Sequence, residues 1–148
     1  MASPFDFTAG NTLTAAQLNS VGKRGDVTWT PTSNWSGTIS ANQYAQVNDV
    51  IILSCVLSLD ATPSGTLEFT SAPVTGSLTL SGISGTGCAV DTSADNVHAI
   101  CPRYNSNGKI GFTTNAENDF ATVVQGKPFT FASGDSIRFV MVYLASWH

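Results

Sequence analysis

The stretch Val50-Ile-Ile-Leu-Ser-Cys-Val-Leu-Ser-Leu59 decides the fold class of this chain. Every second residue from Ile51 to Leu59 is apolar, which is the two-residue period of a β-strand with one face in a core. The opposite face is also largely apolar, because it presents Val50, Ile52 and Val56. An antiparallel strand normally leaves one polar face in water, so the second apolar face predicts that something covers the outside of this strand.

The same double pattern returns near the C-terminus, in the stretch from Ile137 to Leu144. Its predicted inner face alternates with an outer face that contains Val140 and Val142. We expect a neighbouring subunit to cover this outer face, with Val140 and Val142 at the subunit interface. Coverage by the chain's own loops or by its N-terminal segment is the alternative.

Short strand signals separated by turn residues continue through the rest of the body. Asn107-Gly108 is a strong hairpin dipeptide, and Gly85-Thr-Gly87 is also predicted to be a turn. Roughly eight to ten short strands in this order predict an all-β fold, an antiparallel β-sandwich of the jelly-roll type, over residues 26–148. The predicted strands are Asp26–Pro31, Ser40–Val47, Val50–Leu59, Thr66–Thr70, Ser77–Ser84, Cys88–Asp91, Val97–Tyr104, Lys109–Thr114, Phe129–Phe131 and Ile137–Leu144.

A segment of different character precedes the body and ends at about residue 25. Thr14 and Gln17 have the spacing of a capping box, which predicts a short helix. Isolated helices of one or two turns are marginal in water, so this segment needs another surface to rest on. We therefore predict that residues 1–25 form an attachment arm, with apolar contacts made by Phe5, Phe7, Leu13 and Leu18.

Composition argues against two classes of partner. The 148-residue chain has 11% charged residues, a net charge of -4 and a pI near 4.7. Its six Lys and Arg residues form no basic stripe that would neutralise phosphates, so we expect no nucleic-acid partner. No apolar run approaches the ~20 residues that span a bilayer, so we expect no membrane partner. A surface with so few charges favours an oligomer.

Residues suited to catalysis or metal binding are sparse. His98 lies in a predicted strand, where we expect a half-buried structural histidine. With Cys88 and Cys101 it would supply three zinc ligands, but paired CxxC motifs are absent. The acidic segments Asp91–Asn96 and Asn115–Asp119 lack the pattern of a calcium loop. We expect no enzymatic activity, no metal and no cofactor, and reduced cysteines, with a bridge between Cys88 and Cys101 as the alternative.

Aromatic residues beside amides and hydroxyls suggest a possible sugar site. Trp35 lies in a Ser/Asn/Gly loop, Tyr104 precedes Asn105, and Asn115 lies in a polar segment. Sugars bind to such mixtures of rings and polar groups, so Trp35, Tyr104 and Asn115 are candidate glycan contacts. The alternative is that Trp35 packs over the edge of the sandwich, whereas we expect Trp29 in the core.

A resemblance to a known class of proteins begins in the N-terminal segment. Phe7-Thr-Ala-Gly-Asn-Thr-Leu-Thr-Ala-Ala-Gln-Leu-Asn19 is similar to a peptide at the N-terminus of many virion proteins of tailed bacteriophages. Three sequence segments of the body resemble segments of phage fibre-head and capsid-decoration β-sandwiches. They are Asp26-Val-Thr-Trp-Thr-Pro-Thr32, Tyr44-Ala-Gln-Val-Asn-Asp-Val-Ile51 and Phe131-Ala-Ser-Gly-Asp-Ser-Ile-Arg-Phe139.

This resemblance implies a structural protein of the virion, assembled in the host cytoplasm. The resemblance implies, first, a trimeric capsid decoration, or cement, protein whose arms attach to the major capsid protein or another virion protein. Its alternative is the receptor-binding head of a tail or head fibre that recognises a host surface glycan. We expect the chain to be complete from Met1, and no shaft repeat separates the arm from the body, which favours the decoration protein.

Overall fold

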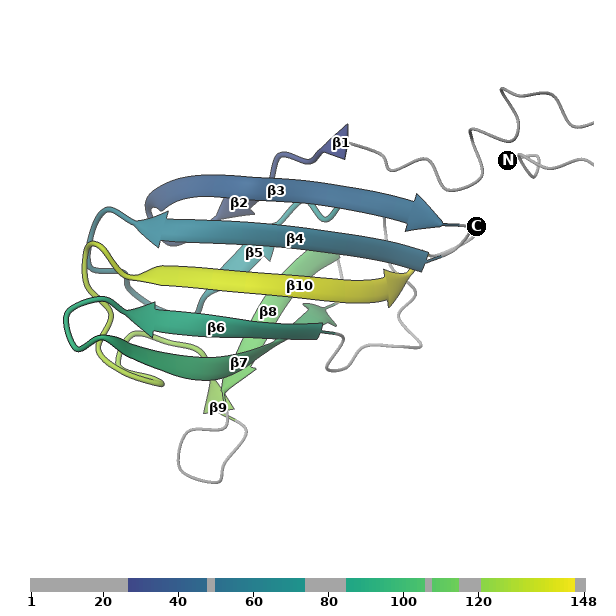
Figure 1. The fold of residues 1–148 in the computed structure, drawn as a ribbon. Coiled ribbons are helices and arrows are strands. Elements are labelled where there is room, and N and C mark those ends of the chain that lie inside the picture. Colours follow the sequence, from purple (N-terminus) through teal and green to yellow (C-terminus); the bar gives the residue numbers. More distant parts are fainter. Residues whose placement is uncertain (1–26, 48–49, 74–84, 106–107, 115–120, 146–148) are drawn as a thin grey trace, which may run out of the picture.

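The computed structural model describes residues 27–47, 50–73, 85–105, 108–114 and 121–145, and in these ranges it contains strands, turns and loops. All of the strands belong to one antiparallel sheet (Figure 1). They are β1 (Val27–Thr28), β2 (Thr32–Ser33), β3 (Gly37–Val47), β4 (Val50–Leu59), β5 (Glu68–Thr70), β6 (Gly85–Asp91), β7 (Asn96–Asn105), β8 (Lys109–Thr114), β9 (Ala121–Thr122) and β10 (Ser136–Leu144).

The sheet folds over into two layers. Strands β3, β4, β10 and β6 form the front layer, and β8 and β5 lie behind them (Figure 1). Strand β7 turns the corner, because Asn96–Ile100 pairs with β6 whereas Ile100–Asn105 pairs with β8. The predicted all-β antiparallel sandwich is therefore confirmed, and its two layers are continuous through β7.

The two edges of the sheet nearly meet. β1 pairs with β3 at one edge and β2 pairs with β5 at the other. Only Trp29, Thr30 and Pro31 separate β1 from β2 along the chain, so this short connection draws the edges together. The Trp29 amide donates to the Asn42 carbonyl, and the Asn34 amide donates to the Glu68 carbonyl, which extends both edge pairings. Near-closure leaves little of the backbone edge open to other chains.

The core lies between the layers and is rich in aromatic rings. The predicted alternation holds, since Ile51, Leu53, Cys55, Leu57 and Leu59 of β4 are all buried. From the back layer Phe69 and Phe112 reach the ring of Phe139 on β10, with ring centroids 5.4 and 4.9 Å from it. These edge-to-face contacts join strands that are distant in sequence and contribute about 0.5–1.5 kcal/mol each beyond area burial.

The strand predictions succeed where the apolar pattern is long. β4 and β8 have the predicted bounds, and β10 begins one residue earlier than predicted. In contrast, Phe129–Phe131 is not a strand, because the Phe129 ring packs on His98 and Phe131 is buried against Trp35 from a loop. The predicted N-terminal helix and the strand predicted at Ser77–Ser84 lie outside the described residues.

The predicted turn at Gly85-Thr-Gly87 is wrong, because these residues begin strand β6. Gly87 pairs with Phe139 of β10. A Cβ at Gly87 would lie 2.5 Å from the carbonyl oxygen of Arg138, so glycine here permits the close approach of β10. A glycine-rich stretch predicts a turn when only sequence is considered, whereas here it serves packing between adjacent strands.

A buried carboxylate holds the loops at one end of the sandwich. Asp135 is 2% exposed and accepts hydrogen bonds from the backbone amides of Thr92 (2.9 Å) and Ala132 (2.8 Å). Its own carbonyl accepts from the amide of Leu59, at 2.8 Å. Asp135 therefore joins the end of β4, the β6–β7 turn and the loop that precedes β10.

Candidate functional site

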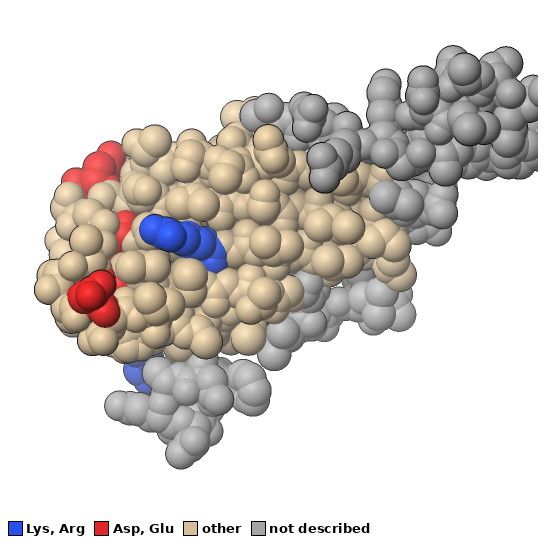
Figure 2. Space-filling view, viewed as in Figure 1, with Lys and Arg blue, Asp and Glu red and all other residues tan. Residues whose placement is uncertain are grey.

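The front layer has an exposed apolar surface, which we call the front face. It consists of the outward side chains of β4 and β10, namely Val50, Ile52, Val56, Val140, Val142 and Leu144. Val140 and Val142 are 46% and 44% exposed, and Val142 pairs with Ile52, which is also exposed. Figure 2 shows that this side of the molecule contains few charged groups. Such contiguous apolar surface on a sheet is typical of a protein contact.

Arg138 is the one charged residue among the described outward positions of β3, β4, β6 and β10. Its Nε donates to the hydroxyl of Ser136 at 3.3 Å. Beside it lies an open depression of about 440 Å³, lined by small side chains that include Ala41, Ser54 and Thr86. The front face is therefore a shallow apolar surface with one cation, and it lacks the convergent titratable groups of an active site.

The structure brings together only part of the predicted site. Val140 and Val142 lie together on the front face, as the alternation along β10 predicts. The predicted attachment residues Phe5, Phe7, Leu13 and Leu18 lie outside the described residues, and so does Asn115.

The two aromatic rings predicted to contact a glycan are in the core. Trp35 is 2% exposed, and its ring meets that of Phe131 edge-on at 4.9 Å. Tyr104 is also 2% exposed and stacks on Tyr143 at 5.0 Å. Neither ring presents a face on which a sugar can stack, so the assignment of Trp35 and Tyr104 as glycan contacts is wrong for this fold. Both rings belong to the hydrophobic core, so Trp35 lies deeper than the sandwich edge over which it was alternatively expected to pack.

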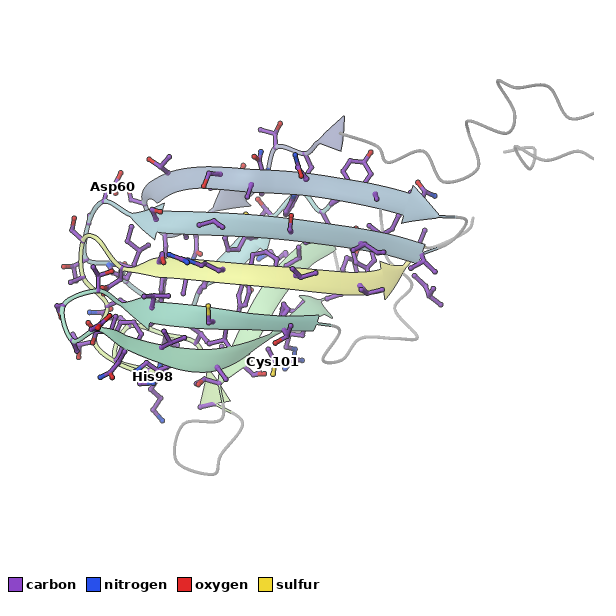
Figure 3. All side chains as sticks on the ribbon, in the orientation of Figure 1. Asp60, His98 and Cys101 are labelled. Carbon is purple, nitrogen blue, oxygen red and sulfur yellow. The ribbon has the colours of Figure 1, made fainter. Side chains whose placement is uncertain are left out.

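His98 is a half-buried residue of β7 that packs against Phe129, with ring centroids 5.0 Å apart. The predicted structural role agrees with this contact. Figure 3 shows His98 and Cys101 on the same strand but apart. No group of three or more His, Cys, Asp or Glu side chains suited to a metal ion occurs within the described part of the chain.

The three cysteines are free thiols. Cys88 of β6 pairs with Ala99 of β7, so Cys101 is two residues out of register for a bridge. Cys55 is buried in the core, and this burial raises the pKa of its thiol to about 12. Cys55 is therefore a neutral packing residue at physiological pH.

In the acidic turn between β6 and β7, the Asp91 carboxylate accepts hydrogen bonds from other residues of the same turn. The Asp91 Oδ1 atom accepts hydrogen bonds from the Ser93 hydroxyl (2.8 Å), the Ala94 amide (3.0 Å) and the Ser93 amide (3.1 Å). These donors hold the pKa of Asp91 below its ordinary value of 3.8, and the Ser93 hydroxyl has the largest effect. These residues therefore form an Asx turn that closes a hairpin.

A second candidate site lies on the back layer and was missed by sequence reasoning. It is a polar cleft of about 210 Å³, which we call the back cleft, lined by Thr66, Glu68, Arg103, Asn105, Gly111, Phe112 and Thr122. These residues come from strands β5, β7, β8 and β9 and from the segment just before β5. Only strand register brings them together, so no motif in the sequence would have indicated the cleft.

Comparisons with known proteins complete this description. No protein-family model, no curated protein and no solved structure matches the chain. Among the described residues there is no helix of sufficient length and apolarity to cross a bilayer.

Proposed function

We propose that this chain is a structural protein of a virion, and specifically a capsid decoration protein that forms a trimer through the front face. The observation that supports the proposal best is the apolar surface formed by Ile52, Val140, Val142 and Leu144. The resemblance of the N-terminal segment and of three sequence segments of the body to phage virion proteins supports the same assignment.

The front face fits an interaction between folded subunits. It is formed by paired strands, so the ladder of β4 and β10 holds its backbone, and its β-branched Val and Ile side chains lose little rotamer freedom on binding. Burial of apolar surface contributes roughly 25 cal/mol per Å² before the cost of association is subtracted. Several valine, isoleucine and leucine side chains in one patch therefore supply the driving force that an exposed polar sheet would lack.

The proposal assigns attachment to residues 1–25. Three arms on one trimer would bind three equivalent positions on a symmetric shell. Each further arm then binds within the same complex, so weak single contacts by Phe5, Phe7, Leu13 and Leu18 add up to stable attachment.

The decoration protein is preferred to a glycan-binding fibre head. The fibre-head alternative named Trp35, Tyr104 and Asn115 as glycan contacts; the first two rings are buried, and Asn115 lies outside the described residues. The decoration assignment is favoured because no shaft repeat separates the arm from the body, and its subunit interface uses Val140 and Val142, which are exposed.

The number of copies per particle tests this function directly. We would quantify the chain by mass spectrometry in purified particles, relative to the major capsid protein. Hundreds of copies are expected for a decoration protein, since only the shell lattice offers that many equivalent sites. A handful of copies would assign the chain to a fibre, and its absence from particles would refute a role in the virion.

Deletion of residues 1–22 tests the attachment arm separately. The shortened chain should be lost from particles while its soluble form still assembles through the front face. Incorporation of the shortened chain at the normal level would show that the arm assignment is wrong.

A further inference from the structure

The back cleft is built around one row of residues across three strands. Glu68 of β5 pairs with Gly111 of β8, and Gly111 in turn pairs with Arg103 of β7. Directly paired residues point to the same face of a sheet. Their chain neighbours Phe69, Phe112 and Tyr104 are buried, so Glu68 and Arg103 point outward. A carboxylate and a guanidinium group thus stand on either side of a position without a side chain.

Gly111 forms part of the floor of this cleft. A Cβ at Gly111 would lie 2.6 Å from Nδ2 of Asn105, which reaches over the glycine from the adjacent strand. Any larger residue would push the carboxamide aside and fill the gap. The absence of a side chain at Gly111 therefore makes room for the Asn105 carboxamide, which lies over the glycine in the cleft that Glu68 and Arg103 line.

The polar groups of the cleft are only partly used by the protein. Glu68 Oε2 accepts from Lys109 Nζ at 2.9 Å, and this is the one ion pair among the described residues. The side chains of Arg103 and Asn105 make no hydrogen bond or ion pair with any other described residue. Since Lys109 balances Glu68, the cleft contains one uncompensated cation in a protein whose net charge is -4.

This set of groups places two requirements on a ligand. The guanidinium of Arg103 favours a planar anion that it can bind through two parallel hydrogen bonds, as a carboxylate does. Glu68 accepts hydrogen bonds, so the rest of the ligand should offer hydroxyl donors. Asn105 and the hydroxyls of Thr66 and Thr122 can donate to or accept from such hydroxyls.

We propose that the back cleft binds one carboxylate-bearing sugar unit of an acidic saccharide. The ligand carboxylate pairs with Arg103, and its ring hydroxyls bind to Glu68, Asn105 and the two threonines. A volume of about 210 Å³ suits a single ring, because pockets for drug-sized ligands measure about 300–1,000 Å³. The cleft lies on the layer opposite the front face, so subunit contacts through Val140 and Val142 leave it accessible.

The test is a titration of the purified full-length chain with glucuronate, followed by saturation-transfer NMR and calorimetry. Saturable binding is expected, and glucose, which has the same ring without the carboxylate, should bind at least tenfold more weakly. Loss of a charge-assisted pair costs about 1.5–3 kcal/mol, so R103Q should also weaken glucuronate binding about tenfold or more. The matched control is R138Q, the same change on the front face, and it should leave the affinity unchanged.

A second variant tests the geometry of the cleft. G111A adds one methyl group between Glu68 and Arg103, and the atom that it meets is the end of the Asn105 side chain, which can move. The chain should therefore fold normally, with an unchanged circular dichroism spectrum, and lose glucuronate binding.

Several results would overturn the proposal. They are no saturable binding of glucuronate, equal effects of R103Q and R138Q, or unchanged binding by G111A. If acetate or an aspartyl peptide binds as tightly as glucuronate, the cleft recognises a carboxylate alone and is not a saccharide site. These measurements need neither particles nor assembly, so their failure would leave the proposed function in the virion untouched.

Discussion

Asp135 is the residue on which the loop end of the sandwich depends. Replacement of Asp135 by Ala removes the acceptor for two backbone amides, those of Thr92 and Ala132, in a position that is 2% exposed. Hydrogen bonds to a charged group contribute about 1.5–3 kcal/mol each, so D135A should lower the free energy of unfolding by about 3 kcal/mol. Urea denaturation monitored by tryptophan fluorescence measures this change.

The control for this prediction is D60N. Asp60 is an exposed acidic residue at the same end of the molecule, where Figure 3 labels it. Its substitution should change the free energy of unfolding by no more than about 0.5 kcal/mol. If D135A and D60N lower the free energy of unfolding by similar amounts, the hydrogen bonds of Asp135 do not stabilise the fold more than an exposed carboxylate does.

Asp91 makes the stability of the β6–β7 hairpin depend on pH. Its pKa is held below 3.8 by the Ser93 hydroxyl, with further donation from the Ala94 and Ser93 amides and a smaller effect of His98. A carboxyl group whose pKa is lower in the folded state stabilises the fold fully above its unfolded value. This contribution is lost as the pH falls from that value through the folded pKa.

The variant D91N should reveal this dependence. At pH 7 the variant should have a lower Tm than the wild type, and the difference should shrink as the pH falls below about 4. Thermal denaturation of both proteins between pH 2 and pH 7 measures the difference. A gap in Tm that stays constant over this range would contradict a role for the Asp91 charge.

At the scale of the element, β6 shows how a strand can depend on glycine. Gly87 pairs with Phe139 of β10, and any Cβ at this position meets the backbone of Arg138. G87A should therefore separate β6 from β10 locally and cost about 1–3 kcal/mol, as overpacking does. Chemical denaturation measures the loss, and amide exchange should show that protection falls along β6 and β10.

The neighbouring residue supplies the control for this prediction. Thr86 lies on the same strand with an exposed side chain. T86A should cost roughly 0.5 kcal/mol or less, because the change affects only the surface. If G87A is as stable as T86A, then β10 does not approach β6 as closely as the structure indicates.

At the scale of the whole molecule, the proposal that subunits associate through the front face makes a direct prediction. Wild-type protein should sediment with the mass of three chains of 15.5 kDa each. The double variant V140D/V142D introduces two carboxylates into the apolar patch, and burying unpaired charges there is strongly unfavourable. It should sediment as a folded monomer, which analytical ultracentrifugation and circular dichroism together would show.

A charge placed on another layer distinguishes interface effects from general ones. Thr122 is an exposed residue of β9, which pairs with the back-layer strand β8. T122D should remain trimeric. A monomeric wild type, or a trimeric V140D/V142D variant, would refute association through the front face.

The sequence alone determined the strands that have long alternating patterns. β4 and β8 were predicted to the residue, and the outward positions of Val140 and Val142 followed from the same period of two. This success has a local cause, because the side-chain direction in a strand depends only on position along that strand. The same reasoning indicated correctly that the outer face of β4 and β10 is apolar.

Only the tertiary structure decided which strands pair and which aromatic rings are buried. Gly85–Gly87 has the composition of a turn, yet it forms a strand because β10 passes close to it. Trp35 lies in a polar loop by sequence, yet the fold buries its ring against Phe131. The back cleft likewise exists only because two register pairings align Glu68, Gly111 and Arg103. Strand pairing and burial depend on contacts between segments that are distant in sequence, and a local sequence pattern does not predict those contacts.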